Sequence, residues 1–241
     1  MSMRNTLLLL SLLFSLSITT NAYAIQVDRM LATMDAQGDK PVFTIKNNDG
    51  ITLFVQTDIA EINVENNVII ETPYNSENLL DWKLNTTPSK IMLLDGQSKD
   101  IYADDLCGDR CSKQHDAVYR VSFIPQPYID PESKQQNRVS LLIGFAPLLI
   151  KPAEDPLIDY EYQRDDANKA IKFNNKGTTL LYFSINTCTP AKLREGTQCE
   201  VSFPVLAGRH RSFTIPDAIY NEAKKITVVN HDETYIKTDL L

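Results

Sequence analysis

The sequence is poor in the residues on which several common kinds of functional site depend. It contains only 8 glycines and 3 histidines among 241 residues. Glycine-rich phosphate loops and multi-histidine metal sites therefore have little material to work with. Basic residues are also outnumbered, since 24 Lys and Arg face 31 Asp and Glu for a formal net charge of −7. Phosphate recognition needs a net basic surface, so a dedicated nucleic-acid-binding protein is excluded.

Signatures of catalysis are also missing from the sequence. It has no H-E-x-x-H, G-x-S-x-G or phosphate-loop motif, and its three histidines, at 115, 210 and 231, have no neighbours at metal-ligand spacing. The acidic pairs Asp104-Asp105 and Asp165-Asp166 are interpreted as solvated loop faces. We therefore expect no enzyme, no cofactor and no metal site. An apolar content of 43% and a charged content of 23% are typical of a folded globular chain.

Residues 1–24 have the pattern of a secretory signal peptide. Arg4 precedes the apolar run Thr6–Ile18, and Asn21-Ala22-Tyr23-Ala24 supplies small residues at positions −3 and −1 of a cleavage site. The run is shorter than the roughly 20 residues that span a bilayer. The sequence predicts export, cleavage after Ala24 and a periplasmic protein; an uncleaved anchor is the alternative.

Four cysteines follow this segment, and export permits disulfide bonds between them. Four cysteines allow three pairings, of which sequence proximity favours Cys107–Cys111 and Cys188–Cys199. A redox or metal role for Cys107 and Cys111 is the alternative. Redox pairs usually have two intervening residues rather than three, and no second Cys/His pair lies nearby to complete a zinc site, so the structural role is favoured.

The rest of the chain consists of short β-type runs separated by turn signals such as Asn47-Asn48-Asp49-Gly50 and Asn174-Asn175-Lys176-Gly177. Such spacing is typical of an all-β sandwich. Prolines in Lys151–Pro156 indicate a linker, because proline cannot continue a strand ladder. We predict an N-terminal domain at residues 25–152 and a C-terminal domain at residues 153–241.

The longest apolar stretch, Val139–Ile150, has apolar residues on both faces of a strand. Val139, Leu141, Ile143 and Phe145 lie on one face, whereas Ser140, Leu142, Gly144 and Ala146 lie on the other. One interpretation is a central strand buried in its own sandwich. The other is a strand whose second apolar face serves a partner chain.

Four segments, in the same order along the chain, resemble the periplasmic pilus chaperones of the chaperone–usher pathway, the PapD-like family. They are Thr86–Ser98, Val118–Pro125, Ile143–Pro152 and Asn174–Leu180. The second and third are closer to the alternate or archaic branch of that family. The resemblance implies an all-β chain of two immunoglobulin-like β-sandwich domains in a boomerang arrangement.

The resemblance also implies a function. Such a chaperone lends a strand to a fimbrial subunit that lacks one, holds it folded, and delivers it to an outer-membrane usher. Val139, Leu141, Ile143 and Phe145 are the expected donor residues, and Leu142 is the alternative, because a slip of one residue exchanges the faces. The rival hypothesis is a secreted structural pilus subunit or adhesin with immunoglobulin-like domains.

Members of the family's better-known branch also hold the subunit's terminal carboxylate with two basic residues in the cleft between the domains. The second of their positions falls near Pro147 here, which carries no charge. The resemblance therefore leaves Arg29, Arg120 and Lys151 as candidate anchors, with ordinary surface charge as the alternative for each.

Overall fold

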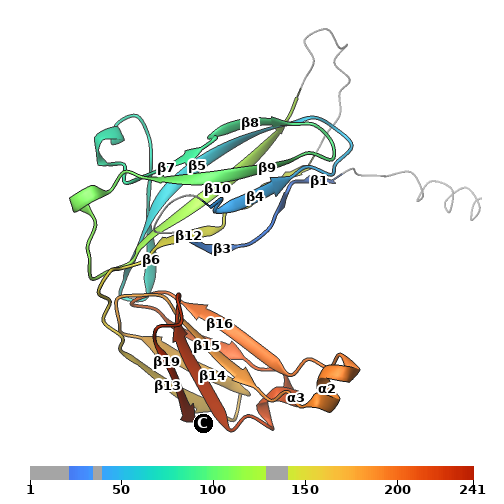
Figure 1. Cartoon of the computed structure of the whole chain (residues 1–241), viewed down its shortest axis with the longest axis vertical. Helices are drawn as coiled ribbons and strands as arrows, with labels where there is room; N and C mark the ends of the chain where they lie inside the picture. Colours follow the sequence, from blue (N-terminus) through green and yellow to red (C-terminus); the bar gives the residue numbers. More distant parts are fainter. Residues whose placement is uncertain (1–21, 35–39, 129–140) are drawn as a thin grey trace, which may run out of the picture.

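The computed structural model describes residues 22–34, 40–128 and 141–241, and β-strands make up most of its regular structure (Figure 1). The first half contains β1 (Ala22–Ala24), β2 (Gln26–Val27), β3 (Leu31–Thr33), β4 (Phe43–Lys46), β5 (Leu53–Glu65), β6 (Val68–Pro73), β7 (Leu84–Thr87), β8 (Lys90–Leu93), β9 (Ser98–Asp105), β10 (Ala117–Pro127), β11 (Leu141–Ile143) and β12 (Leu148–Lys151), with 3-10 turns η1 (Leu79–Asp81) and η2 (Gly108–Arg110). The second half contains β13 (Tyr160–Asp165), β14 (Ala170–Asn175), β15 (Leu181–Asn186), β16 (Glu200–Val205), β17 (His210–Thr214), β18 (Lys225–Asn230) and β19 (Ile236–Leu240), with short helices α2 (Pro190–Glu195) and α3 (Asp217–Tyr220).

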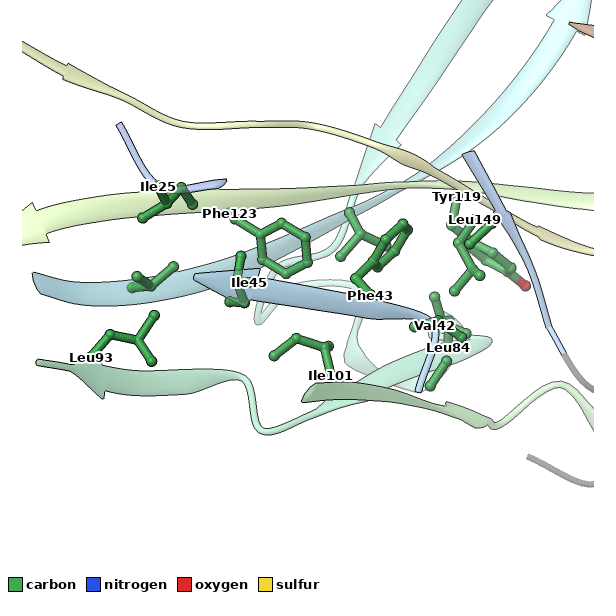
Figure 2. Packing of buried hydrophobic residues seen from close by; sticks show 14 of the residues in the cluster. Ile25, Val42, Phe43, Ile45, Leu84, Leu93, Ile101, Tyr119, Phe123 and Leu149 are labelled. Carbon is green, nitrogen blue, oxygen red and sulfur yellow. The ribbon is translucent and has the colours of Figure 1, made fainter. Parts of the chain in front are cut away.

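The N-terminal half forms a sandwich of two sheets. One sheet has the order β3-β12-β10-β5-β6, with β8 also paired to β5, and the other has the order β2-β4-β9-β7. Alternate residues of these strands point between the sheets, as the period of two requires. Figure 2 shows Ile25, Phe43 and Phe123 in this interior, where all three are fully buried.

The C-terminal half forms a second, smaller sandwich. Its sheets have the orders β13-β14-β17 and β16-β15-β18-β19. Stacked aromatic rings dominate the interior, with Phe173 and Phe183 at a centroid distance of 4.6 Å. All strands from β13 onward pair only with one another, so the two sandwiches have separate sheets and separate cores.

A buried asparagine stabilises a turn in each sandwich. Asn47 Nδ2 donates to the carbonyls of Ile51 and Leu93 at 2.8 and 2.9 Å. Asn175 Nδ2 donates to the carbonyls of Thr179 and Val205 at the same two distances. Buried backbone carbonyls need such partners, which explains why asparagine is present in the two turns that the sequence predicted.

The two sandwiches meet at one end and diverge from there like the arms of a boomerang (Figure 1). Where they meet, a small apolar cluster, which we call the interdomain seam, joins Ile62, Val118 and Ile150 of the first sandwich to Leu180 of the second. The predicted all-β, two-sandwich architecture is therefore confirmed.

The structure corrects one feature of the sequence analysis. The run Val139–Ile150 was expected to be strand-like throughout, but the described part of it divides into β11 and β12. Between them, Phe145 forms an isolated bridge with Phe123. Pro147 has no N–H to contribute, although its carbonyl accepts a 2.9 Å bond from Val121 N. Regular pairing with β10 resumes at Leu148, the first residue of β12, which lies opposite Arg120.

Candidate binding edge and the basic residues near it

β11 lies at the margin of the N-terminal sandwich, beside the end of β10. The bridge between Phe123 and Phe145 fixes it there through reciprocal backbone bonds of 2.7 and 3.2 Å. The opposite margin of β11, which we call its outer edge, faces away from β10 and pairs with β1 in this chain. An exposed strand edge presents unpaired backbone groups on which another strand can form.

The predicted donor residues do not all have the same surroundings. Ile143 is 43% exposed, so much of its side chain is open to solvent. Phe145 and Leu142 are half-buried and pack against the core of the N-terminal sandwich. Leu141 lies in β11, and Val139 falls outside the described residues. Ile143 is thus the predicted donor whose side chain is observed to be available to a partner.

Gly144 allows β11 to approach β10 closely. A Cβ built on Gly144 would lie 2.4 Å from the carbonyl oxygen of Phe123 and 3.1 Å from Pro125 Cδ. Real Cβ atoms do not come this close to a backbone oxygen, so the two segments would have to separate. Glycine at this position therefore determines where Ile143 and Phe145 are placed.

Replacing Gly144 by alanine should push β11 away from β10. We expect a loss of about 1–3 kcal/mol in the free energy of unfolding, the usual range for overpacking. Urea denaturation of the variant would measure this loss. Ala146→Ser, at an exposed position in the same segment, is the matched control and should remain within about 0.5 kcal/mol of the parent. Equal stability of Gly144→Ala and the parent would contradict the close approach.

The three candidate anchors each contact a carboxylate. Arg29 donates to Asp28 at 2.7 Å, Lys151 Nζ lies 2.6 Å from Asp105 Oδ2, and Arg120 forms an ion pair with Glu71. Partly exposed pairs of this kind contribute little stability, typically 0–1 kcal/mol. An incoming carboxylate can therefore compete for such a guanidinium at a modest cost.

The anchors differ in the face of the sheet that they occupy. Arg120 shares a face of β10 with Val118, which belongs to the interdomain seam. Lys151 shares a face of β12 with Leu149, which points into the N-terminal core. Lys151 and Arg120 therefore lie on opposite faces of one sheet.

Arg29 precedes the strand β3, which lies one strand away from Arg120 across β12. Leu148 of β12 lies opposite Arg120 in the pairing with β10 and opposite Leu31 in the pairing with β3. Arg29 is two residues before Leu31. Arg120 also has a buried Nε that bonds to no group among the described residues. An N–H in this position is suited to an acceptor supplied by a partner chain.

Polar contacts centred on two residues of the first sandwich, Asp116 and Asn67, join it to the linker and to the second sandwich. The Asp116 carboxylate accepts bonds from Ala153 N at 2.9 Å, Thr179 Oγ1 at 3.0 Å and Leu180 N at 2.7 Å. Separately, Asn67 at the β5–β6 turn accepts a 3.0 Å bond from His210 N of β17. These contacts hold the two arms together where they meet.

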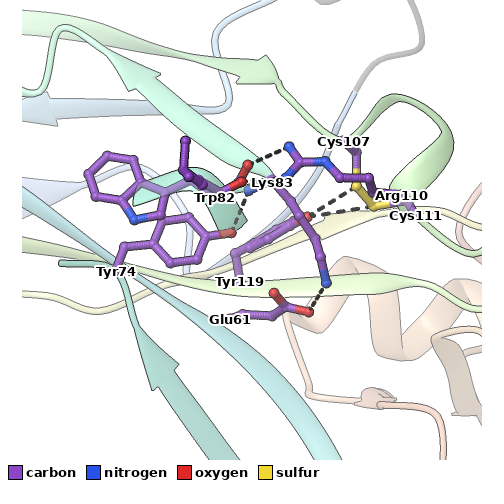
Figure 3. A network of polar contacts seen from close by, with 9 residues as sticks. Glu61, Tyr74, Trp82, Lys83, Cys107, Arg110, Cys111 and Tyr119 are labelled. Carbon is purple, nitrogen blue, oxygen red and sulfur yellow. Dashed lines mark hydrogen bonds and ion pairs between the residues drawn. A yellow bond between two sulfur atoms is a disulfide. The ribbon is translucent and has the colours of Figure 1, made fainter. Parts of the chain in front are cut away.

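The disulfides join Cys107 to Cys111 and Cys188 to Cys199, with Cα–Cα distances of 5.4 and 4.8 Å. This is the pairing that sequence proximity favours. Figure 3 shows the first bridge above the hydroxyl of Tyr119, which lies 4.0 Å from both sulfurs. Burial, followed by the nearby Tyr74 and Glu61, raises the pKa of Tyr119 well above its usual value, so this hydroxyl stays protonated.

The Cys107–Cys111 loop also positions two polar side chains. Cys107 N donates to Asp105 Oδ1 at 2.9 Å, and the other oxygen of Asp105 holds Lys151. Arg110 donates to the carbonyls of Leu80 and Trp82 at 2.8 Å, which ties η1 to the disulfide loop (Figure 3). These contacts make the Cys107–Cys111 bridge a structural element of this end of the domain.

Two features of other functional classes are missing from residues 22–34, 40–128 and 141–241. No cluster of three His, Cys, Asp or Glu side chains in these ranges could hold a metal ion. None of the helices described there has the length and hydropathy needed to cross a bilayer.

Comparison with known families identifies the N-terminal sandwich. A family model described as the CS5 fimbrial protein N-terminal domain matches residues 27–152. The chain belongs to this family. The CS5-type domain extends from β2 to the end of β12 and therefore includes β11, Arg29, Arg120 and Lys151.

Curated relatives of this CS5-family chain match only part of it. A nucleotide-binding protein of Clostridium acetobutylicum is 32% identical over 127 residues, which is 52% of this chain and 36% of that protein. A nucleotide-binding protein of Clostridium kluyveri is 33% identical over 110 residues, which is 45% of this chain and 30% of that protein. The chain thus spans about a third of the length of the curated relatives that it matches.

Solved structures cover far more of the chain at lower identity. The class 5 fimbriae chaperone CfaA is 15% identical with a TM-score of 0.50, covering 90% of this chain and 98% of its own. A second match is the CsuC–CsuE complex of a chaperone and a tip adhesion subunit from the archaic Csu pili of Acinetobacter baumannii. It is 11% identical with a TM-score of 0.49, covering 89% of this chain and 96% of that one. At this identity the likeness to CfaA is one of fold, and that fold is the one that the resemblance to pilus chaperones implies.

Proposed function

We propose that this CS5-family chain is a periplasmic chaperone that lends β11 to a fimbrial subunit. The observation that carries the proposal is Ile143, a large aliphatic side chain exposed on a strand at a sheet margin. A subunit lacking one strand of its sandwich would accept the backbone of β11 and bury Ile143 in its own core. Burial of such a side chain contributes about 1.5–3 kcal/mol before ordering costs.

The proposal includes the biological setting. The signal peptide, residues 1–24, would be removed after Ala24 to leave a periplasmic chain with domains at residues 25–152 and 153–241. The chaperone would carry out no covalent chemistry and need no cofactor. It would hold the subunit folded, prevent premature polymerisation and deliver it to an outer-membrane usher.

We also propose that Arg120 is the principal carboxylate anchor and that Arg29 assists it. Arg120 is supported by its place beside the interdomain seam and by its buried Nε, which has no hydrogen-bond partner in the described part of the chain. Lys151 was an equal candidate from the sequence, but it points to the other face of the sheet and contacts Asp105. It is therefore the natural control.

Replacing Arg120 by alanine should weaken binding of a fimbrial subunit about tenfold, which corresponds to the loss of one charge-assisted hydrogen bond of about 1.5 kcal/mol. Lys151→Ala should change affinity by less than about twofold. Titration of each variant with the subunit would measure both effects. A larger loss in Lys151→Ala than in Arg120→Ala would reverse the assignment, and unchanged affinity in both variants would remove the anchor.

The rival function is that of a structural fimbrial protein, which the words "CS5 fimbrial protein" in the family's description favour. The structure offers an argument on the other side. Ile25, directly after the proposed cleavage site, is already buried in the core, so the processed chain would have no free extension with which to complete a neighbouring subunit. A structural pilus subunit needs such an extension, because it supplies the strand that completes the next subunit in the fibre.

Co-expression with a candidate fimbrial subunit separates the two functions. A chaperone should be recovered in a stable one-to-one complex and should be absent from assembled fibres. The subunit expressed alone should aggregate or be degraded. Recovery of this chain as a component of surface fibres would overturn the proposal in favour of the structural role.

A further inference from the structure

The outer edge of β11 is not free in the full-length chain. β1, which consists of Ala22 to Ala24, runs parallel to β11 along this edge. Its three residues lie opposite Leu141, Leu142 and Ile143 in register. Under the proposed processing, these three residues are the end of the signal peptide, so the segment that export removes occupies the edge at which a subunit would bind.

The position of β1 is determined by the residue that follows it. Ile25 is fully buried in the N-terminal core, and Gln26 and Val27 continue into the opposite sheet, where β2 pairs with β4. Only the peptide bond between Ala24 and Ile25 separates β1 from this buried side chain. A chain that retains its signal peptide therefore keeps these residues next to β11.

We infer that residues 22–24 cover the subunit-binding edge of β11 until the signal peptide is removed. This inference rests on the proposed function, both for cleavage after Ala24 and for β11 as the donor strand. The chain would thus carry a temporary occupant of its own donor edge, and processing would be the step that makes the chaperone competent to bind.

The argument depends on competition between a tethered strand and a free one. A segment joined to its site by a short connection acts at an effective concentration of the order of millimolar. Three residues of parallel strand form a weak ladder alone, but the tether favours them over a dilute competitor. A subunit must displace β1 before its own strand can pair, which lowers its apparent affinity.

Three forms of the protein, each purified in the same mild detergent, test the inference. The first is the processed chain beginning at Ile25. The second is the full chain with Ala22→Leu and Ala24→Leu, which removes the small residues needed for cleavage. The third is the full chain with Ala22→Leu, Tyr23→Pro and Ala24→Pro, which retains the signal peptide but removes the N–H groups of Tyr23 and Ala24. Proline has no N–H, so neither of the last two positions of β1 can then donate a hydrogen bond to β11.

Amide hydrogen exchange at residues 141–143 is the first measurement, and it needs no subunit. We expect exchange at least about tenfold slower in the second form than in the first, with the fast rate restored in the third, since local opening sets these rates. Equal exchange in the first and second forms would overturn the inference.

Binding of a purified fimbrial subunit is the second measurement. The second form should bind at least about tenfold more weakly than the first, and the third should recover most of the difference. Protection of residues 141–143 without subunit binding by any form would contradict the proposed function while leaving the occupancy of the edge intact. Equal binding by a protected second form and the first would overturn the inference that β1 blocks the edge.

Discussion

Replacing Ile143 by glutamate is expected to weaken binding of a fimbrial subunit at least about 100-fold, a change of about 3 kcal/mol. Two effects add in this variant. The subunit would lose the burial of a large aliphatic side chain, which contributes about 1.5–3 kcal/mol. It would also have to accept a carboxylate in an apolar groove, where an unpaired charge is strongly disfavoured. Titration of the processed chain with a purified subunit measures the affinity.

The same variant should fold normally. Ile143 is 43% exposed, so glutamate at this position costs the free chaperone little. Met92→Glu is the matched control, because Met92 is a 56% exposed apolar residue of β8 in the same sandwich. Loss of binding in Ile143→Glu alone supports β11 as the donor. Equal loss in both variants, or unchanged affinity in Ile143→Glu, would exclude Ile143 from the interface.

Removing the Asp116 carboxylate is expected to have the largest effect on stability. Asp116→Ala would leave three donors without their acceptor: Ala153 N, Leu180 N and Thr179 Oγ1. All three residues are buried, so water cannot fully replace the carboxylate. We expect a loss of about 2–4 kcal/mol in the free energy of unfolding, measured by urea denaturation followed by circular dichroism.

The effect of Asp116→Ala should extend to the joint between the sandwiches, because its donors lie in the linker and in the second sandwich. Small-angle scattering should show a broader distribution of interdomain distances. Asp155→Ala is the control, because this exposed linker residue donates to Lys113 O at 2.9 Å through its backbone N–H, which is kept in the variant. If Asp116→Ala is as stable as Asp155→Ala, the carboxylate does not hold the joint.

The position of Arg120 relative to the second sandwich depends on this joint, which connects the stability result to the proposed function. Arg120 lies beside the interdomain seam on the same sheet face as Val118. A looser joint would make the position of the second sandwich relative to Arg120 variable. A subunit that contacts both arms would then pay an additional ordering cost on binding.

The sequence was sufficient to predict the fold class and several turns. Alternating apolar residues in runs such as Ala117–Pro127 indicate half-buried strands, and the turns at Asn47 and Asn175 follow from local backbone preferences. These features depend on neighbours in the chain. They are therefore visible without knowing which strands pair.

The details of the candidate site depend on contacts between distant residues. The close approach of β11 to β10 depends on Gly144 meeting the Phe123 carbonyl, about twenty positions away in the sequence. Alternation alone places Ile143 and Phe145 on one face, whereas the structure exposes Ile143 and packs Phe145 on the core. The alternation of apolar residues within one segment does not reveal an interruption that depends on contact with another strand.

The roles of charged residues also depend on distant partners that the sequence alone does not identify. Lys151 could be placed before a proline from the sequence, but its partner Asp105 is 46 positions away. Asp116 was not identified at all, because its acceptor role joins residues 153, 179 and 180 and has no local signature. A basic or acidic residue in a β-sandwich acquires its role from the face of the sheet that it occupies, which only the pairing register determines.

The most direct test of the central claim is a crystal structure of the processed chain bound to a fimbrial subunit. We predict a subunit strand hydrogen-bonded along the outer edge of β11, with the Ile143 side chain inside the core of the subunit. We also predict that the terminal carboxylate of the subunit lies within hydrogen-bond distance of Arg120. A complex in which the outer edge of β11 is unpaired and Ile143 remains in solvent would contradict the proposal that this strand captures the subunit.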